Sequence, residues 1–449
     1  MDEEDNLEPF KLFNIWARTH YVPFYKAYKQ VAEEIDVDLF ICEHAINYPC
    51  FDLAWKLGKP VVGVSPSYRV FHPPYRSDPT YGCHVNMENE SFYDRFICAT
   101  IAPLRFIWIS IEIIYNVNIE RAKVGIDSHW DPRGRISNIL MLFNYFFGVE
   151  VPSIESPLHQ EIGPILPDTF LDLSPEIDSF LTNHPRTMYF ALGTNVFIDP
   201  HKCFALLKSF LKLIDQNVID GVVWAFVRTN TSDLLSFNDF DVHISDILNN
   251  NHSHIHVIKH APQFAILSHE NTKLFLSHGG ISSIHESIYT ATPMLILPFF
   301  GDQLENAEKV ELAGMALKLS KFNINVDDIV LKAKRLLNEK SFKINAERLQ
   351  FLAKVNSKRK HRGADLIEVV MNRAKYEREN GESKIDNENL LKDWITPDTR
   401  MGYMRGKYID VYGVAILLLL IFIFVLFKII KFFYIMGGKF QQSLKLKKD

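Results

Sequence analysis

The segment from His260 to Gln303 has the residue types and the spacing of a site for a phosphorylated ligand. Lys273 to Leu276 is a short apolar run that leads into Ser277-His278-Gly279-Gly280, and residues 282–289 follow with helical spacing. The glycines are therefore expected at a strand-to-helix turn, where free backbone N–H groups favour an anion and the missing side chains let a phosphate approach. Ser282 and Ser283 add hydroxyl donors in the first helical turn.

A second strand-to-helix unit follows at once. Residues 294–298 have the pattern of a buried strand, and the loop after them reads Phe299-Phe300-Gly301-Asp302-Gln303. Because ligands bind at the carboxyl ends of the strands in open α/β sheets, we expect four side chains to meet in one crevice: His278, Glu286, Asp302 and Gln303. A Gly-Gly turn alone is more often plain punctuation between a strand and a helix. The ordered set indicates a nucleotide-sugar site.

This ordered set resembles the signature of the family 1 glycosyltransferases, the UDP-glycosyltransferases or UDP-glucuronosyltransferases. The resemblance extends from about Val37 to the C-terminus and is strongest over residues 160–310. In that family the motif opens W-x-P-Q, where the tryptophan stacks on uracil and the glutamine contacts the ribose. Here Gln263 matches the glutamine, and His260 replaces the tryptophan with a smaller ring that can still stack.

The resemblance also implies contacts to the rest of the donor. His278 and Gly280 match the residues that hold the β-phosphate, Ser282 and Ser283 fall where α-phosphate contacts lie, and Glu286 matches the carboxylate that accepts from the ribose hydroxyls. Asp302-Gln303 matches the pair that reads the sugar's hydroxyls, a role that suits an acceptor-only carboxylate beside a two-way amide. Upstream, residues 189–194 resemble the family's V-S-F-G-S strand, whose turn, here Gly193-Thr194, faces the diphosphate.

The acceptor side of the site is less complete. Inverting transfer needs a base for the acceptor's proton, and the family uses a histidine oriented by an aspartate. Glu43 occupies the aspartate's position, at the end of the strand expected over residues 38–42. The histidine has no clear match: His20 opens an H-x-x-P sequence without the family's preceding strand and glycine, and His44 points away from Glu43 if the strand continues. The family has more chain at this end, so the sequence is expected to lack the N-terminal signal and the first βα units.

Two other patterns could bind metal, and a structural interpretation is preferred for both. His252, His254 and His256 alternate as strand neighbours do, and Asp239-Phe-Asp241 resembles the D-x-D clamp of the other glycosyltransferase fold. We expect no metal and no cofactor beyond the UDP-sugar donor. The net charge of −5 gives no basic surface for nucleic acid, and the five cysteines neither demand nor exclude a disulfide.

The C-terminal part predicts a membrane anchor. Val411 to Phe427 is uncharged and long enough to span, and lysines follow it, so the positive-inside rule places the tail in the cytosol and the body in the lumen. The last five residues, Lys445-Leu-Lys447-Lys-Asp449, match a K-x-K-x-x retrieval signal, which predicts a single-pass type I protein of the endoplasmic reticulum membrane. Three sequons, at Asn89, Asn230 and Asn251, give weak support. The apolar stretch 92–125 is expected to be a buried helix, although the family's equivalent is often membrane-associated.

These features predict an α/β protein of GT-B architecture, with two Rossmann-like domains facing a cleft and a C-terminal transmembrane helix. The expected boundaries are 1–160 for an incomplete acceptor-side domain, 161–357 for the UDP-sugar domain, 358–409 for a helical connector, 410–436 for the membrane helix and 437–449 for a basic tail. The expected function is transfer of a hexosyl group from a UDP-sugar to a lipophilic hydroxyl acceptor. The alternative is a membrane-anchored nucleotide-sugar-binding protein without catalysis. The sugar, the acceptor and the oligomeric state, homo-oligomer included, stay open.

Overall fold

The computed structural model describes residues 8–66, 79, 82–153, 155–226, 234 and 244–445. The chain divides into two compact units, Met1–Leu391 and Lys392–Asp449. The first unit contains two parallel sheets, and the second contains a long apolar helix. Asp239, Asp241, the sequon at Asn230 and the last residues of the proposed retrieval signal lie outside the described residues.

A six-stranded parallel sheet lies in the C-terminal half of the first unit, with strand order β10-β9-β8-β5-β6-β7. Its strands are β5 (Thr187–Ala191), β6 (Gly221–Ala225), β7 (Ile255–Ile258), β8 (Thr272–Ser277), β9 (Met294–Ile296) and β10 (Ala316–Lys318). Counted from β5, this is the doubly wound order 6-5-4-1-2-3 of a Rossmann fold. The apolar runs expected at 273–276 and 294–298 thus lie in strands β8 and β9.

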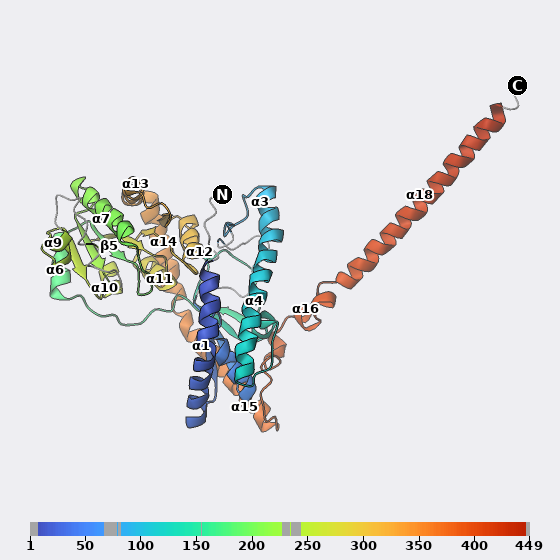
Figure 1. Cartoon of the computed structure of the whole chain (residues 1–449), viewed down its shortest axis with the longest axis horizontal. Coiled ribbons are helices and arrows are strands. Elements are labelled where there is room, and N and C mark those ends of the chain that lie inside the picture. The colour runs from blue at the N-terminus through green and yellow to red at the C-terminus, as the bar shows by residue number, and fades with distance from the viewer. Residues whose placement is uncertain are drawn as a thin grey trace. The chain divides into compact units, whose positions relative to one another are not determined.

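Helices cover both faces of this sheet, which explains why its strands read as nearly continuous apolar runs. Met188 and Phe190 of β5 pack in one core with α7 (Pro200–Asp215) and α13 (Val326–Asn338). Tyr189 and Ala191 face the other core, together with α6 (Pro175–Asn183), α10 (Gln263–Ser268), α11 (Ile281–Thr290) and α14 (Lys340–Asn356). Figure 1 shows α7 and α13 on one side of β5 and α6 and α10 on the other. The half of the first unit that contains the six-stranded sheet also includes the short helix α9 (Ile244–Leu248) and the helix α12 (Gln303–Leu312).

The other sheet has four parallel strands in the order β1-β2-β3-β4. They are β1 (Phe40–Glu43), β2 (Val61–Ser65), β3 (Met141–Phe143) and β4 (His159–Glu161), with the helices α1 (Glu8–Glu34), α2 (Tyr48–Leu57) and α5 (Pro132–Ser137) nearby in the chain. A buried ion pair fixes the helices: Arg121 Nε lies 2.7 Å from Asp52 Oδ2. Tyr21 donates to the same oxygen at 2.7 Å, so α1, α2 and the helix α4 (Ala102–Lys123), which carries Arg121, share one polar centre inside an apolar core.

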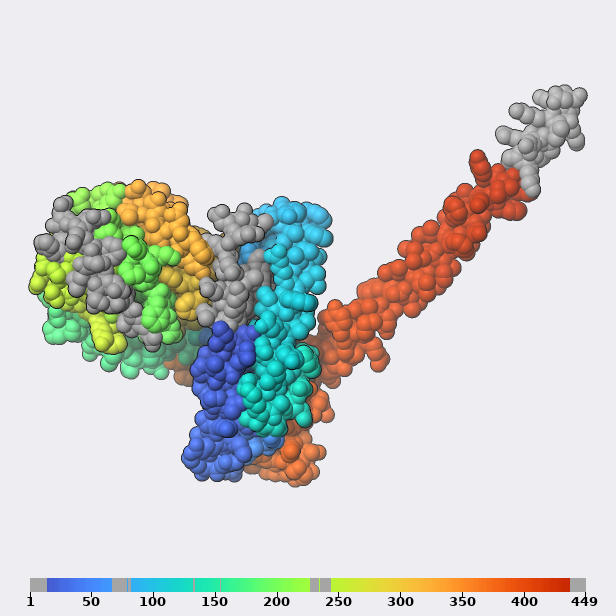
Figure 2. All heavy atoms as spheres, viewed as in Figure 1, coloured from blue at the N-terminus to red at the C-terminus, as the bar shows by residue number. Residues whose placement is uncertain are grey.

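Residues 92–123 form one long helical rod composed of α3 (Phe92–Phe96), a π-helical turn (Ile97–Ile101) and α4 (Ala102–Lys123). The wide turn lies just before Pro103, which has no N–H to donate. The expectation of a buried helix is wrong for most of this rod: Trp108 is 79% exposed and Phe92 is 77% exposed, while residues such as Ile113 and Val117 face the core. Figure 2 shows the rod at the surface beside α1, to which Asn116 is joined by a hydrogen bond to Asn14.

Four of the five cysteines form disulfides, Cys42–Cys50 and Cys83–Cys98. The first joins the end of β1 to α2, and the second joins the segment before α3 to the π-helical turn. Cys203 is free and buried, and burial raises the pKa of its thiol to about 12. The cysteine pattern in the sequence left this outcome open.

After the six-stranded sheet, the chain returns to the four-stranded sheet. Helix α15 (Arg359–Glu379) buries Leu366 and Val370, and the segment after it docks beside β2. There Asn387 Oδ1 accepts from the backbone N–H of Val61 at 2.9 Å, and Asn387 Nδ2 donates to the carbonyl of Lys59 at 2.9 Å. Much of the expected connector is therefore part of the compact first unit, while the domain boundaries at 160, 357 and 409 stay predictions.

The second unit contains a 3₁₀ turn (Lys392–Trp394), α16 (Pro397–Arg400), α17 (Tyr403–Gly406) and α18 (Ile409–Lys445). Residues 409–436 of α18 are long and apolar enough to cross a membrane, and so is the rod 92–123, by length and composition. No residue of the apolar window in α18 is buried inside the protein, which makes this helix the candidate span expected from the sequence.

We predict that Asn387→Ala destabilises the first unit. The change leaves the buried N–H of Val61 without a partner, at about 1–3 kcal/mol, and also removes the donor to the part-buried carbonyl of Lys59. Chemical unfolding of the full chain in detergent, followed by tryptophan fluorescence, measures the loss. Asn389→Ala is the matched control, because Asn389 is exposed and bonds only locally to Asp386 among the interactions of the described chain. Equal effects of the two changes would contradict the docking role of Asn387.

Candidate functional site

In the doubly wound sheet, the direction in which successive strands are added reverses between β5 and β8, its two central strands. Ligands bind at the carboxyl ends of the strands at such a point, because the connecting helices leave in opposite directions and open a crevice. The loop after β5 carries Gly193-Thr194, and the loop after β8 carries His278-Gly279-Gly280. The sequence predicted both loops as binding loops, and the strand order places them side by side.

The imidazole of His278 packs between glycines of both loops. A Cβ atom at Gly193 would lie 2.7 Å from His278 Cε1, and one at Gly280 would lie 2.5 Å from His278 Nε2. Gly193 also has a φ of +70°, a conformation that glycine adopts without strain. The ring therefore requires glycine at both positions.

Burial keeps this imidazole neutral. It lowers the pKa of His278 to about 4. The buried Nδ1 atom makes no hydrogen bond within the described part of the chain. Because buried polar atoms are normally paired, this nitrogen is suited to a polar ligand atom.

The N-terminus of α11 begins directly after this histidine, at Ile281. Gly280 is the N-cap residue, and no side chain caps the helix there. The first-turn N–H groups and the positive end of the helix dipole are therefore available to an anion. Ser282 is exposed beside them, and Ser283 is 7% exposed.

A polar network joins α10, α11 and β5 at the same end of the sheet. Gln263 Nε2 donates to Glu286 Oε2 at 2.8 Å and to Ser283 Oγ at 3.2 Å. Tyr189 OH donates to Gln263 Oε1 at 3.4 Å. Burial raises the pKa of Glu286, and the hydrogen bond from Gln263 opposes this rise. The structure thus brings together three predicted residues, Gln263, Ser283 and Glu286, and adds Tyr189, which the sequence analysis missed.

Asp302 and Gln303 open α12, and neighbouring residues hold both. Gln303 Oε1 accepts from the backbone N–H groups of Phe299 and Phe300, at 2.9 and 3.2 Å. Asn306 Nδ2 donates to Asp302 Oδ2 at 2.8 Å and to the carbonyl oxygen of Gly279 at 3.3 Å. The loops after β8 and β9 are therefore tied together through Asn306. The sequence analysis missed this residue, although its i+4 spacing from Asp302 is the relevant signal.

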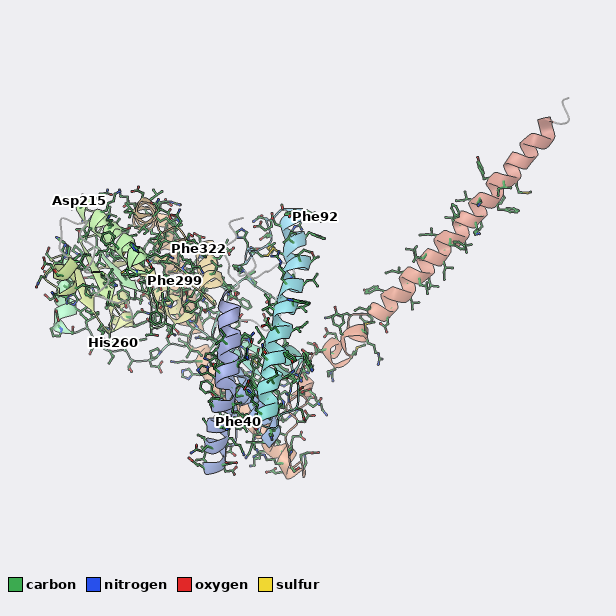
Figure 3. The ribbon with its side chains drawn as sticks, in the orientation of Figure 1. Phe40, Phe92, Asp215, His260, Phe299 and Phe322 are labelled. Atoms are coloured by element: carbon green, nitrogen blue, oxygen red, sulfur yellow. A yellow bond between two sulfur atoms is a disulfide. The ribbon has the colours of Figure 1, made fainter. Side chains whose placement is uncertain are left out.

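His260 and Thr194 are exposed at the rim. His260 follows β7, and Figure 3 labels it together with Phe299 from the loop after β9. Within the described ranges, no hydrogen bond or ring contact joins His260 to the other predicted site residues. Its assignment to a base-stacking role stays a prediction.

Glu43 lies in the other sheet, at the carboxyl end of β1. Its carboxylate accepts from the backbone N–H groups of Ala45 and Ile46, at 2.8 and 2.9 Å, and burial raises its pKa despite these bonds. The strand ends at Glu43, so His44 does not continue the alternation, and its Nδ1 lies 3.8 Å from Glu43 Oε1. His20 lies in the middle of α1, stacked on Trp16.

The histidines His252 and His254 before β7, and His256 within it, have structural contacts. His254 Nδ1 is 2.8 Å from the carbonyl oxygen of Asp220, and His252 Nδ1 accepts from the backbone of His254. His256 is buried against the ring of Phe180. No group of three or more metal-binding side chains occurs among the residues that the structure describes.

Comparison with known proteins identifies the family of this arrangement. Residues 136–375 match the family model described as UDP-glucoronosyl and UDP-glucosyl transferase. A UDP-glycosyltransferase of Talaromyces amestolkiae is 34% identical over 348 residues, which cover 75% of this chain and 64% of that protein. UDP-glucuronosyltransferase 1A6 of Homo sapiens is 30% identical over 215 residues, covering 47% of this chain and 36% of that protein. The chain thus spans less than two thirds of the length of these relatives.

Solved structures with the same fold are similar over most of the chain. The glycotransferase of kitacinnamycin superposes with a TM-score of 0.56 at 17% identity, covering 80% of this chain and 82% of that chain. Os79 from O. sativa superposes with a TM-score of 0.53 at 16% identity, covering 79% and 82%. These likenesses and the two parallel sheets confirm the predicted α/β GT-B fold.

We predict that Gly193→Ala displaces the His278 ring and raises the pKa of this histidine from about 4 toward the ordinary 6.5, because the displaced ring becomes hydrated. NMR titration of chains labelled at histidine measures this pKa. Gly381→Ala is the matched control: its φ is also positive, at +97°, and nothing lies within 4 Å of the added Cβ. An unchanged pKa of His278 in Gly193→Ala would show that the ring does not depend on this glycine.

Proposed function

Because the chain belongs to the family of UDP-glucuronosyl and UDP-glucosyl transferases, we propose that it transfers a hexosyl group from a UDP-sugar to a hydroxyl of a lipophilic acceptor. The observation that carries this proposal is the packing of His278 between Gly193 and Gly280, in the loops after β5 and β8, next to the uncapped N-terminus of α11. Such a terminus binds an anion through oriented N–H groups. The proposed donor site needs no metal and no cofactor.

The donor's diphosphate is assigned to the α11 end of the crevice. The β-phosphate lies against His278 and Gly280, the α-phosphate lies against Ser282 and Ser283, and the Gly193-Thr194 turn closes the other side. A neutral imidazole can donate one hydrogen bond without bringing a buried charge. The helix N-terminus stabilises the negative charge that develops on the leaving UDP.

The nucleoside and the sugar are assigned to the flanking networks. Glu286 accepts from the ribose hydroxyls, Gln263 contacts the ribose, and His260 stacks on the uracil. Asp302 and Gln303 read the hydroxyls of the sugar. Since Gln303 Oε1 is already held by two backbone N–H groups, its Nε2 is the atom proposed to face the sugar.

Transfer with inversion requires the acceptor oxygen to attack the anomeric carbon from the side opposite UDP. A bond forms from that oxygen to the anomeric carbon, the bond from this carbon to the β-phosphate oxygen breaks, and the electron pair leaves with UDP. We assign the hydroxyl proton to the carboxylate of Glu43. Its raised pKa, a consequence of burial, makes it a stronger base than an exposed glutamate.

The proposed location is the endoplasmic reticulum membrane, with α18 as a single-pass anchor, the body in the lumen and the basic tail in the cytosol. The exposed apolar surface of α18 and the lysines that follow its uncharged stretch support this topology. Two disulfides agree with an oxidising compartment. Lipophilic acceptors would reach such an enzyme through the bilayer.

Binding of the donor is the direct test of the function. Titration calorimetry on the full chain in detergent is expected to show that UDP and UDP-glucose bind, and transfer is assayed with a panel of hydrophobic alcohols. Binding without transfer to any acceptor would favour the alternative, a membrane-anchored nucleotide-sugar-binding protein. No binding at millimolar UDP would contradict the donor site.

We predict that Asp302→Ala and Gln303→Ala lose discrimination between UDP-sugars while they keep most of the affinity for UDP. Their proposed partners are on the sugar, and each hydrogen bond lost from a buried group costs about 1–3 kcal/mol. Calorimetry with UDP and with two UDP-hexoses measures the difference. Equal losses for UDP and for the UDP-sugars would contradict this assignment.

We predict that Glu43→Gln lowers kcat by about 10²–10⁴-fold, the usual contribution of a positioned base. In the unchanged chain the ionised carboxylate is the active form. The rate should therefore rise with pH through a pKa above the ordinary value of a glutamate, and this limb should vanish in Glu43→Gln. Glu120→Gln is the control, since Glu120 is a buried carboxylate of α4 that binds Lys123. A parallel His44→Gln chain shows whether the neighbouring ring takes part.

A further inference from the structure

Helix α12, which carries Asp302 and Gln303 at its start, contains a buried lysine in its last turn. Lys309 Nζ lies 2.7 Å from Glu150 Oε2 and 2.7 Å from Glu305 Oε1. The three side chains are 3%, 3% and 4% exposed, respectively. Two carboxylates thus meet one ammonium group inside the protein.

The contact with Glu150 joins segments that are far apart in the chain. Glu150 follows β3 of the first sheet and lies 159 residues before Lys309. Glu305, in contrast, is on α12 itself. One of the two bonds therefore holds the helix to the segment after β3, whose Phe146 packs in the core of the six-stranded sheet, and the other orients the lysine.

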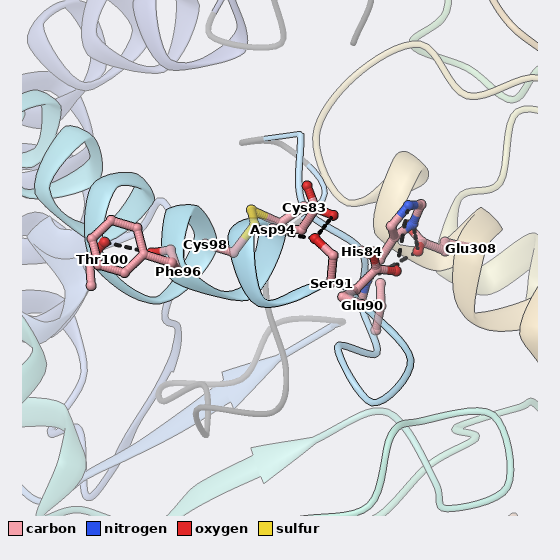
Figure 4. The surroundings of a disulfide bond; sticks show 10 residues. Cys83, His84, Glu90, Ser91, Asp94, Phe96, Cys98, Thr100 and Glu308 are labelled. Atoms are coloured by element: carbon pink, nitrogen blue, oxygen red, sulfur yellow. Dashed lines mark hydrogen bonds and ion pairs between the residues drawn. A yellow bond between two sulfur atoms is a disulfide. The ribbon is translucent and has the colours of Figure 1, made fainter.

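The residue before Lys309 in α12 makes a second contact, with the segment before α3. Glu308 Oε1 accepts from His84 Nδ1 at 2.7 Å and from the backbone N–H of Val85 at 3.1 Å. Figure 4 shows His84 against Glu308, next to the disulfide that binds Cys83 to Cys98. Two consecutive residues thus fix α12 against two different segments of the first half.

Lys309 supplies the positive charge of the cluster that it forms with Glu150 and Glu305. The neighbouring His285 is fully buried, and burial first, then the charge of Lys309, lowers its pKa to about 3. A small pocket beside Lys309 is lined by His285, Asn306, Glu150 and Tyr145. A neutral histidine beside the lysine leaves Glu150 and Glu305 to balance the ammonium charge.

A buried ion pair is weak evidence for stability, since apolar residues of the same volume often do as well. Its distinct property is a defined geometry, because each buried charge must meet its partner. Here the geometry bears on the start of α12: at 1.5 Å per residue, Lys309 lies about 9 Å along the helix from Gln303. Asn306, one turn before Lys309, holds Asp302 and Gly279.

We propose that Lys309 is a positioning residue for recognition of the donor sugar: by its bond to Glu150 it sets the place of α12, and with it the places of Asp302 and Gln303. The inference rests on the proposed function. The diphosphate and ribose contacts are on other elements, α10, α11 and the loop after β5. Since Asn306 also ties α12 to the carbonyl of Gly279 in the loop after β8, loss of the Glu150 bond should affect the sugar more than UDP.

The test uses the full chain in detergent with four changes: Glu150→Gln, Lys309→Met, Lys309→Arg and the control Lys332→Met. Lys332 also makes a 2.7 Å i,i+4 pair, with Asp328. It lies on α13, and its side chain is 25% exposed. Calorimetry measures the affinities for UDP and for UDP-glucose, and a transfer assay measures kcat and KM. Glu150→Gln keeps the size of the side chain and the Glu305 partner, so it is informative even where Lys309→Met fails to fold.

The expected result is a loss of the affinity difference between UDP-glucose and UDP in Glu150→Gln and Lys309→Met. A fall in kcat of up to about 10²-fold should accompany it, the effect of a small misplacement. Lys309→Arg should restore most of both, and Lys332→Met should change neither. A lower melting temperature with an unchanged UDP-glucose to UDP ratio would overturn the proposal and leave a structural role. Absence of UDP binding in the unchanged chain would instead remove the proposed function, and this inference with it.

Discussion

The reversal of connection between β5 and β8 is the constraint on which the rest of the donor site depends. Because the chain leaves these adjacent strands toward opposite ends of the sheet, no helix closes the gap between their loops. The gap is narrow, and the His278 ring fills it only because Gly193 and Gly280 carry no side chain. The start of α11, the Gln263 network and the α12 loop are arranged around this contact.

The two halves of the first unit meet at α12 through both apolar and polar contacts. Phe146, which follows β3, packs in the same core as Val310 of α12. The six-stranded sheet has one apolar core on each of its two faces. The core of the four-stranded sheet lies among α1, α2, α4 and β1. Between them, Glu150 and His84 reach α12 with charged or polar groups. Such contacts require defined geometry and add little stability over apolar packing. They are suited to a contact whose position matters more than its strength.

The sequence was sufficient for local features and insufficient for distant ones. Apolar runs predicted β8 and β9, and Gly279-Gly280 predicted the turn between β8 and α11, because strand burial and helix starts are encoded within a few residues. Strand order was beyond it, since the pairing of β5 with β8 joins residues about 85 positions apart. Lys309, four residues after Glu305, has the spacing of an exposed helical charge pair, and the sequence does not reveal its bond to Glu150, 159 residues away. The prediction for residues 92–123 was wrong because their apolar composition indicates burial, whereas the fold leaves one face of this helix uncovered.

The polar groups of the site are mostly hydrogen-bonded to one another, and these bonds determine which contacts contribute affinity and which contribute selectivity. A ribose hydroxyl that reaches Glu286 competes with Gln263, and a sugar hydroxyl that reaches Asp302 competes with Asn306. Such an exchange of one hydrogen bond for another yields little net free energy. It does reject ligands that cannot complete the exchange, because a buried group is then left unpaired. The uncapped N-terminus of α11 and the unpaired Nδ1 of His278, within the described chain, have no such internal competitor. Affinity is therefore expected to come mainly from the diphosphate, and selectivity from the nucleoside and the sugar.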